Sequence, residues 1–232
     1  LMKGCDRKTD PESINYNWPL STPAAQGLDK KKIDAAYIKA AELGFVDALL
    51  VIRNGYLVAE DYYNGYGPNA PHQLWSVTKS FLSALVGIAL DNGFIDDIDG
   101  KVMDYFPEYA FAGMDPRFSD ITVRDLLAMR MGIDREQINL IPVVTTDNWI
   151  RETFKLPLLY DPGTKFSYNS LQSLLLSAII TKTSGMTVRQ FAEQYLTGPM
   201  GIEIYSWGSD PQGNNIGDVW GDGNDITFAH GL

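Results

Sequence analysis

Two long apolar stretches stand out in the pattern of hydrophobic and polar positions along the chain. Residues 81–90 read FLSALVGIAL, and residues 170–185 read SLQSLLLSAIITKTSG. A helix that is apolar on every side is typical of a buried core. The pattern therefore predicts one core helix from Ser76 to about Asn92 and a second from Ser170 to Gly185.

An amphipathic helix and a β-hairpin precede these core helices. Apolar residues recur every three or four positions between Asp29, which can cap a helix, and Leu43, which Gly44 follows. Residues 48–63 then read ALLVIRNGYLVAEDYY, two β-rich runs joined by Asn54-Gly55, the strongest short-range pattern for a tight hairpin. Two strands alone form a marginal sheet, so the pattern predicts an α/β part that is unfinished within these residues.

Shorter helices fill the rest of the chain. TVRD from residue 122 and TVRQ from residue 187 have the form of a capping box, which predicts helices over 122–131 and 187–196. Residues 147–155 show a weaker helical pattern. The predicted organisation is a polar lead-in (1–28), the N-terminal part of an α/β domain with a helix and a hairpin (29–64), and a core helix followed by a helical domain (65–232).

Composition and charge narrow the class of protein. The 232 residues are 45% apolar, which indicates a folded globular protein, and the net charge of -10 argues against nucleic acid as a partner. No apolar run reaches the ~18 residues that span a bilayer. The single cysteine, Cys5, excludes an internal disulfide. Two interpretations of Cys5 stay open: a lipid-modified residue that tethers the protein to a membrane, or a chance terminal cysteine.

Ser76 and Lys79 begin the first core helix and raise a chemical question. At this spacing the two side chains share one face of a helix. No Asp or Glu lies within four residues of Lys79, so no local ion pair explains a lysine beside an apolar run. Burial disfavours the charged form of a lysine and makes its amine a better base for a neighbouring serine. The alternative is a surface lysine whose stem covers apolar surface, in a Ser-x-x-Lys sequence that arose by chance.

Tyr168 is the next candidate, just before the second core helix in YDPGTKFSYNS. Its hydroxyl could relay a proton to a leaving group. The alternative is a tyrosine that packs at the helix start, with Ser170 as the N-cap. The chain contains no GxGxxG, GxxxxGK, HExxH or GxSxG sequence. Its two histidines, His72 and His230, are assigned ordinary polar roles, and the acidic sequence IDDIDG at 95–100 lacks the ligand positions of an EF-hand.

Several motifs occur together in one order: SVTK at 76–79, ITVRDLLAMRMGI at 121–133, DPGTKFSYNS at 161–170 and SAIITKTSGMTVRQFAEQYLTGPMGI at 177–202. In this order they resemble serine hydrolases of the β-lactamase and penicillin-binding-protein superfamily. The resemblance is closest to class C β-lactamases, family VIII esterases, D-Ala-D-Ala carboxypeptidases and 6-aminohexanoate-dimer hydrolases. It extends from about residue 17 to the end.

The resemblance implies a role for each candidate residue. Ser76 matches the acylated nucleophile, Lys79 its general base, and Tyr168 the tyrosine of a Tyr-x-Asn motif. Ser170 stands in place of that asparagine, a departure that weakens the β-lactamase interpretation and favours other amides or esters. Trp75, Asn169 and Ser170 are the predicted substrate contacts, although Asn169 comes one residue too early for the motif. The superfamily's last motif, of Lys-Thr-Gly or His-x-Gly type, is not found in these residues.

The implied fold is an α/β plus all-helical, β-lactamase/transpeptidase-like architecture with an antiparallel sheet flanked by helices. The chain is expected to stop before the C-terminal strands return to the sheet. The implied function is hydrolysis of a small-molecule amide or ester through an acyl-enzyme, outside the cytoplasm, with no metal or organic cofactor. The alternative is a catalytically inactive relative that binds peptidoglycan or a protein.

Overall fold

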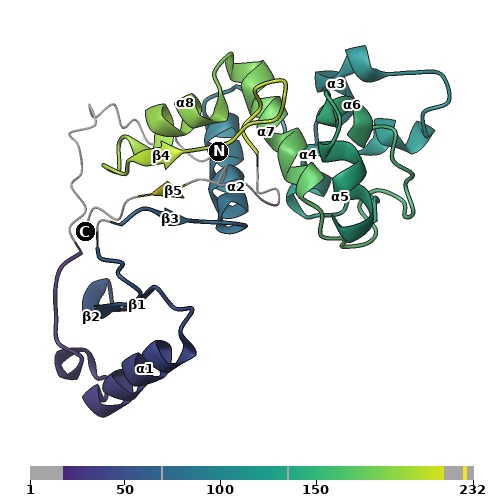
Figure 1. Cartoon of the computed structure of the whole chain (residues 1–232). Helices are drawn as coiled ribbons and strands as arrows, with labels where there is room; N and C mark the ends of the chain where they lie inside the picture. Colours follow the sequence, from purple (N-terminus) through teal and green to yellow (C-terminus); the bar gives the residue numbers. More distant parts are fainter. Residues whose placement is uncertain (1–17, 69, 135, 217–226, 229–232) are drawn as a thin grey trace. The chain divides into compact units, whose positions relative to one another are not determined.

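The computed structural model describes residues 18–68, 70–134, 136–216 and 227–228 (Figure 1). The chain divides into two compact units. The first comprises residues up to His72 together with Pro199–Glu203, and the second comprises Gln73–Gly198 and Ile204–Phe228. The sequence pattern predicts the boundary between the two parts a few residues earlier, at residue 65. Cys5 and His230 lie outside the described residues, so the predictions about them remain predictions.

The first unit contains the predicted amphipathic helix. Helix α1 spans Lys30–Leu43, and the carboxylate of Asp29 caps it by accepting a hydrogen bond from the backbone N–H of Lys31 at 2.9 Å. The helix ends at Gly44, whose φ of 71° is the left-handed conformation that glycine adopts without steric cost. Both predicted boundaries of this helix are confirmed.

The predicted hairpin follows. Strand β1 (Ala48–Arg53) pairs antiparallel with β2 (Tyr56–Tyr62), with an irregularity in register after Val51. Asn54 and Gly55 both have positive φ, 51° and 79°, as the tightest hairpin turn requires. An isolated parallel bridge joins Leu57 of β2 to Leu20. Within the described residues β1 has β2 as its only strand partner, so the sheet of this unit has two strands, as the sequence predicts.

The second unit is built around helix α7 (Ser170–Ser184). All residues from 170 to 180 are buried (Figure 1). Helix α7 packs against α2 (Val77–Asp91), α4 (Val123–Leu127), α5 (Glu136–Val144), α6 (Trp149–Thr153) and α8 (Val188–Ala192). Burial on every side explains why the sequence shows no polar stripe there. Helix α2 (Val77–Asp91) is the other predicted core helix, and it ends at Asn92 as expected. Only one face of it is buried, which includes Leu82, Leu85 and Val86, so the prediction of a helix buried on every side is wrong for α2.

Helix α4 is shorter than predicted. It spans Val123–Leu127 and has the capping box expected at Thr122, but the pattern predicts a helix that continues to residue 131. The early end is caused by Met129, which adopts the left-handed conformation at φ 54°. The Met129 N–H donates to the Leu126 carbonyl, and the Arg130 N–H donates to the Asp125 carbonyl. These are the two bonds of a Schellman C-cap, in which methionine takes the place usually held by glycine.

The remaining elements are short. Helix α8 begins with the capping box expected at Thr187 and is followed by a turn of π-helix. No helix among the described residues is both long and apolar enough to cross a membrane. The other helices are α3 Val102–Tyr105, α5 Glu136–Val144, α6 Trp149–Thr153 and α8 Val188–Ala192, and the π-helical turn is Glu193–Thr197. Turns of 3-10 helix lie at Ala24–Gln26, Pro107–Tyr109 and Pro116–Asp120. A second sheet consists of β3 (His72–Gln73), β4 (Ile204–Ser206) and β5 (Thr227–Phe228), and its strands lie in the order β3-β5-β4.

Candidate active site

Ser76 lies at the N-cap position of α2, directly after a residue with an unusual backbone conformation. The residue before it, Trp75, has φ +46°, which is rare for a bulky side chain and stores backbone strain. The Ser76 side chain makes no capping hydrogen bond to the helix. Its hydroxyl is therefore directed to partners other than the helix backbone.

Those partners are the two other predicted catalytic residues. Lys79 Nζ lies 3.1 Å from Ser76 Oγ, and the Tyr168 hydroxyl lies 2.7 Å from the same oxygen. Lys79 Nζ also lies 5.1 Å from the centre of the Tyr168 ring. Tyr168 is 92 residues from Ser76 in the sequence, so folding brings the three predicted residues together.

This arrangement suits proton transfer from the serine. Ser76 Oγ is within hydrogen-bond reach of an amine and a phenol, each of which can accept or relay a proton. Ser76 is exposed and Lys79 is half-buried, so the serine is accessible to a small molecule. The Lys79 head contacts Ser76, which distinguishes Lys79 from a surface lysine that extends into solvent.

The two residues after Tyr168 differ from the sequence-based prediction. Asn169 is fully buried at 0% exposure, and its side chain caps α7 by accepting from the Leu171 N–H at 2.9 Å. Its amide also donates to the Asp134 carbonyl at 3.0 Å. The structure thus gives Asn169 a structural role in place of the predicted substrate contact, and makes it, rather than Ser170, the N-cap. Ser170 is the first residue of α7 and is only 2% exposed, which leaves little of its surface for a substrate.

Trp75 remains a candidate for substrate contact. It directly precedes Ser76, and about half of its surface is exposed. Val77 on the other side of Ser76 and Phe166 ahead of Tyr168 are exposed as well. Phe166 and Tyr168 are exposed while Ser167 and Asn169 are buried. This alternation is typical of an extended segment and puts the two aromatic side chains on the same face.

The sequence pattern predicts no role for Gln172, yet this residue is fully buried and donates a hydrogen bond to the segment that carries Tyr168. Its only distinguishing feature in the sequence is that an amide interrupts the apolar stretch LQSLLLSAII. A buried amide in a core helix needs partners, and this requirement could have drawn attention to it.

His72 has the structural role expected from the sequence. Within the first unit its Nε2 lies 2.8 Å from Asp47 Oδ2, and Asn64 donates to the other oxygen of Asp47 at 2.9 Å. The hydrogen bond from Asn64, followed by that from His72, holds the pKa of the Asp47 carboxyl below its usual value. His72 is thus engaged by a carboxylate.

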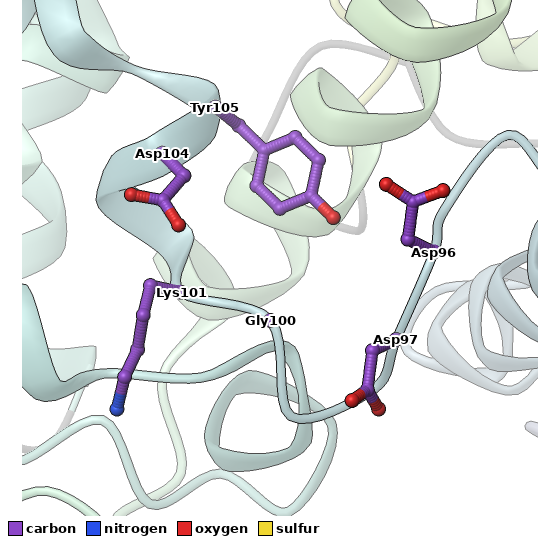
Figure 2. Close-up of a pocket in the computed structure, with 6 residues that line it drawn as sticks. All are labelled: Asp96, Asp97, Gly100, Lys101, Asp104 and Tyr105. Carbon is purple, nitrogen blue, oxygen red and sulfur yellow. The ribbon is translucent and has the colours of Figure 1, made fainter.

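A separate cavity of about 310 Å³ lies beyond the C-terminal end of α2. Figure 2 shows Tyr105 pointing across it toward Asp96, while Lys101 points away. Burial raises the pKa of the Tyr105 hydroxyl, and Asp96, Asp104 and Asp97 add to the effect. The 15-residue helix α2 rises ~22 Å, so this cavity is remote from Ser76 at the other end. In the part of the chain that is described, no group of His, Cys, Asp and Glu side chains could hold a metal ion.

Comparison with known families gives a match over most of the chain. A model of the beta-lactamase family matches residues 39–225. The 6-aminohexanoate-dimer hydrolase of Paenarthrobacter ureafaciens is 29% identical over an alignment of 166 residues, and the alignment covers 65% of this chain and 41% of that enzyme. The chain thus spans about two fifths of the length of this relative.

Solved structures with the same fold include enzymes and a homologue of penicillin-binding proteins. The octameric penicillin-binding protein homologue from Pyrococcus abyssi has a TM-score of 0.61 at 20% identity, covering 87% of this chain and 54% of that one. A D-stereospecific amidohydrolase from Streptomyces sp. has a TM-score of 0.58 at 18% identity, covering 77% and 58%. These similarities confirm the predicted fold class.

Proposed function

The chain belongs to the beta-lactamase family, and on this premise we propose that it is a serine hydrolase that forms an acyl-enzyme at Ser76. The observation that carries the proposal is the placement of Ser76 Oγ within hydrogen-bond reach of both Lys79 Nζ and the Tyr168 hydroxyl. The similar proteins described above include a 6-aminohexanoate-dimer hydrolase and a D-stereospecific amidohydrolase. A dedicated nucleophile beside a base is the arrangement that covalent catalysis requires.

The proposed reaction has two halves. In the first, the neutral amine of Lys79 takes the proton of Ser76 while Oγ attacks the carbonyl carbon of an amide or ester. Tyr168 relays that proton to the leaving group as the carbonyl bond to it breaks, and an ester between Ser76 and the acyl group remains. In the second half, water attacks this ester and gives its proton to the Lys79 amine; the acid is released, and the proton from water passes to Ser76 Oγ.

The surroundings of Ser76 favour a small uncharged substrate. Trp75, Val77 and Phe166 are exposed apolar side chains next to Ser76 or next to its partner Tyr168. Apolar and aromatic surface with few polar groups is typical of a site for neutral ligands. Position 170 lacks the asparagine of the motif and carries a buried serine instead, which agrees with amides and esters other than β-lactams.

We expect kcat/KM to be higher for short acyl esters, such as p-nitrophenyl butyrate, than for the cephalosporin nitrocefin, because nitrocefin carries an anionic carboxylate. Spectrophotometric assays of the full-length protein with both substrates would measure the ratio. A kcat/KM for nitrocefin near the ~10⁶ M⁻¹s⁻¹ of an efficient enzyme would overturn the substrate assignment and leave the acyl-enzyme mechanism in place.

Covalent labelling tests the acyl-enzyme directly. A fluorophosphonate probe should modify the protein, and mass spectrometry should place the adduct on the peptide that contains Ser76. Ser80→Ala is the matched control, because Ser80 is an exposed serine one turn later in the same helix, and this variant should label like the wild type. If neither protein is labelled, the inactive binding module becomes the better interpretation.

A further inference from the structure

Gln172 is a fully buried amide in the first turn of α7, with 0% of its surface exposed. Its Oε1 accepts a hydrogen bond from the Met131 backbone N–H at 2.9 Å. Its Nε2 donates to the Ser167 carbonyl, also at 2.9 Å. One side chain therefore joins α7 to two loop segments, one of which carries Tyr168.

The segment around Tyr168 is fixed on both sides. Before it, the Ser167 N–H donates to the Met129 carbonyl at 2.8 Å, while the Ser167 carbonyl accepts from Gln172. After it, the Asn169 side chain is held by α7 and by Asp134. Tyr168 itself is 37% exposed and its hydroxyl reaches Ser76. The position of this hydroxyl thus depends on how firmly its neighbours are held.

The second segment held by Gln172 has little freedom of its own. Met129 adopts the left-handed conformation, and so does Gly132, at φ 102°. A Cβ atom at Gly132 would lie 2.4 Å from the Tyr160 carbonyl oxygen, so only glycine fits there. Gln172 therefore ties the Tyr168 segment to a rigid support, and it does so with both of its polar atoms.

We propose that Gln172 is a positioning residue that sets the distance between the Tyr168 hydroxyl and Ser76 through its hydrogen bonds to Ser167 and Met131. The kinetic part of this inference rests on the proposed function, in which Tyr168 relays a proton. Gln172 does not touch the reacting atoms, because it is buried within the helix start. Misplacing a catalytic group by about 1 Å can cost ~10²-fold in rate, which is why this support matters.

Two substitutions separate its two bonds. Gln172→Glu keeps the shape and the acceptor for Met131 but replaces the donor to the Ser167 carbonyl with an acceptor. Gln172→Met keeps the length of the side chain and removes both bonds. Ser177→Ala is the matched control, because Ser177 is buried on the same helix and donates to the Asn215 carbonyl, away from the Tyr168 segment.

The first measurement is independent of catalysis. The protein is labelled at the tyrosine Cζ, and the NMR resonance of Tyr168 is identified by its loss in Tyr168→Phe. This resonance should shift or broaden in both Gln172 variants. It should stay unchanged in Ser177→Ala. A Tyr168 resonance that is unchanged in a folded Gln172 variant overturns the proposal. If Gln172→Met does not fold, Gln172→Glu, which preserves the volume, carries the test.

The second measurement links position to rate. Gln172→Met should lower kcat for p-nitrophenyl butyrate ~10²-fold with little change in KM. In a Tyr168→Phe background the same substitution should lower kcat by less than about 3-fold, because the hydroxyl that Gln172 positions is no longer there. Equal losses in both backgrounds would indicate a purely structural role and overturn the proposal. Failure of the proposed function would show differently: Ser76→Ala would retain activity whatever the tyrosine resonance does.

Discussion

Replacing Ser76 with alanine should abolish turnover of p-nitrophenyl butyrate by the full-length protein and leave its stability nearly unchanged. Activity should be lost because Ser76 Oγ is the atom that Lys79 and Tyr168 both contact, and no acyl-enzyme forms without it. Stability should be retained because Ser76 makes no capping hydrogen bond to α2. The usual N-cap penalty of ~1 kcal/mol therefore does not apply.

Initial rates and chemical denaturation of the two proteins would check both halves of this expectation. Ser80→Ala is the control for removing a hydroxyl from the same helix, and it should keep wild-type activity. Activity of Ser76→Ala above about a hundredth of the wild type would count against covalent catalysis at this residue. A large loss of stability would instead show that the hydroxyl has a structural role.

Much of the fold can be predicted because its causes are local. Helix α7 is buried on every side from residue 170 to residue 180, and that burial is visible in the sequence as a mostly apolar stretch without a charged residue. The hairpin is specified by Asn54-Gly55, which supplies the two positive φ angles of its turn. The Ser76–Lys79 contact is local as well, since residues three apart on a helix face the same way.

The parts that were wrong or missed depend on contacts between distant segments. Helix α4 ends at Leu127, ahead of the left-handed Met129, and nothing in the residue type predicts this conformation. The Met129 carbonyl accepts a hydrogen bond from the Ser167 N–H, which is distant in the sequence. Asn169 and Ser170 are both good N-caps, and the choice of Asn169 is favoured by its second bond, to the Asp134 carbonyl 35 residues earlier. Likewise Gln172 owes its role to Met131, 41 residues away. Spacing along the chain carries no information about such partners.

The resemblance to serine hydrolases of the superfamily implies a catalytic role for Tyr168, whereas the local sequence leaves two interpretations of this residue open. From the residues alone, a tyrosine before a core helix is as easily a packing residue as a proton relay. The structure places its hydroxyl 2.7 Å from Ser76 Oγ, while its ring stays partly exposed. A tyrosine that served only packing would gain more by burying its ring, so the geometry favours a chemical role.

Substitution of Lys79 by methionine and of Tyr168 by phenylalanine should each lower kcat at least ~10²-fold, the usual scale for a group that transfers a proton. Lys79→Met replaces the half-buried amine with an apolar chain of similar length, so the free energy of unfolding should not fall. Tyr168→Phe keeps the ring and loses one hydrogen bond to an exposed serine, worth about 1 kcal/mol at most. Steady-state kinetics and denaturation curves would separate chemistry from stability in both variants.

The double variant provides the sharpest test of the arrangement. Because Lys79 and Tyr168 both contact the same oxygen of Ser76, they should act as one unit, and residues that act as a unit show strongly non-additive losses. We therefore expect the double variant to be little slower than Lys79→Met alone. Losses that multiply would mean that the two residues work in independent steps. If Lys79→Met instead unfolds the protein, Lys79 has a structural role.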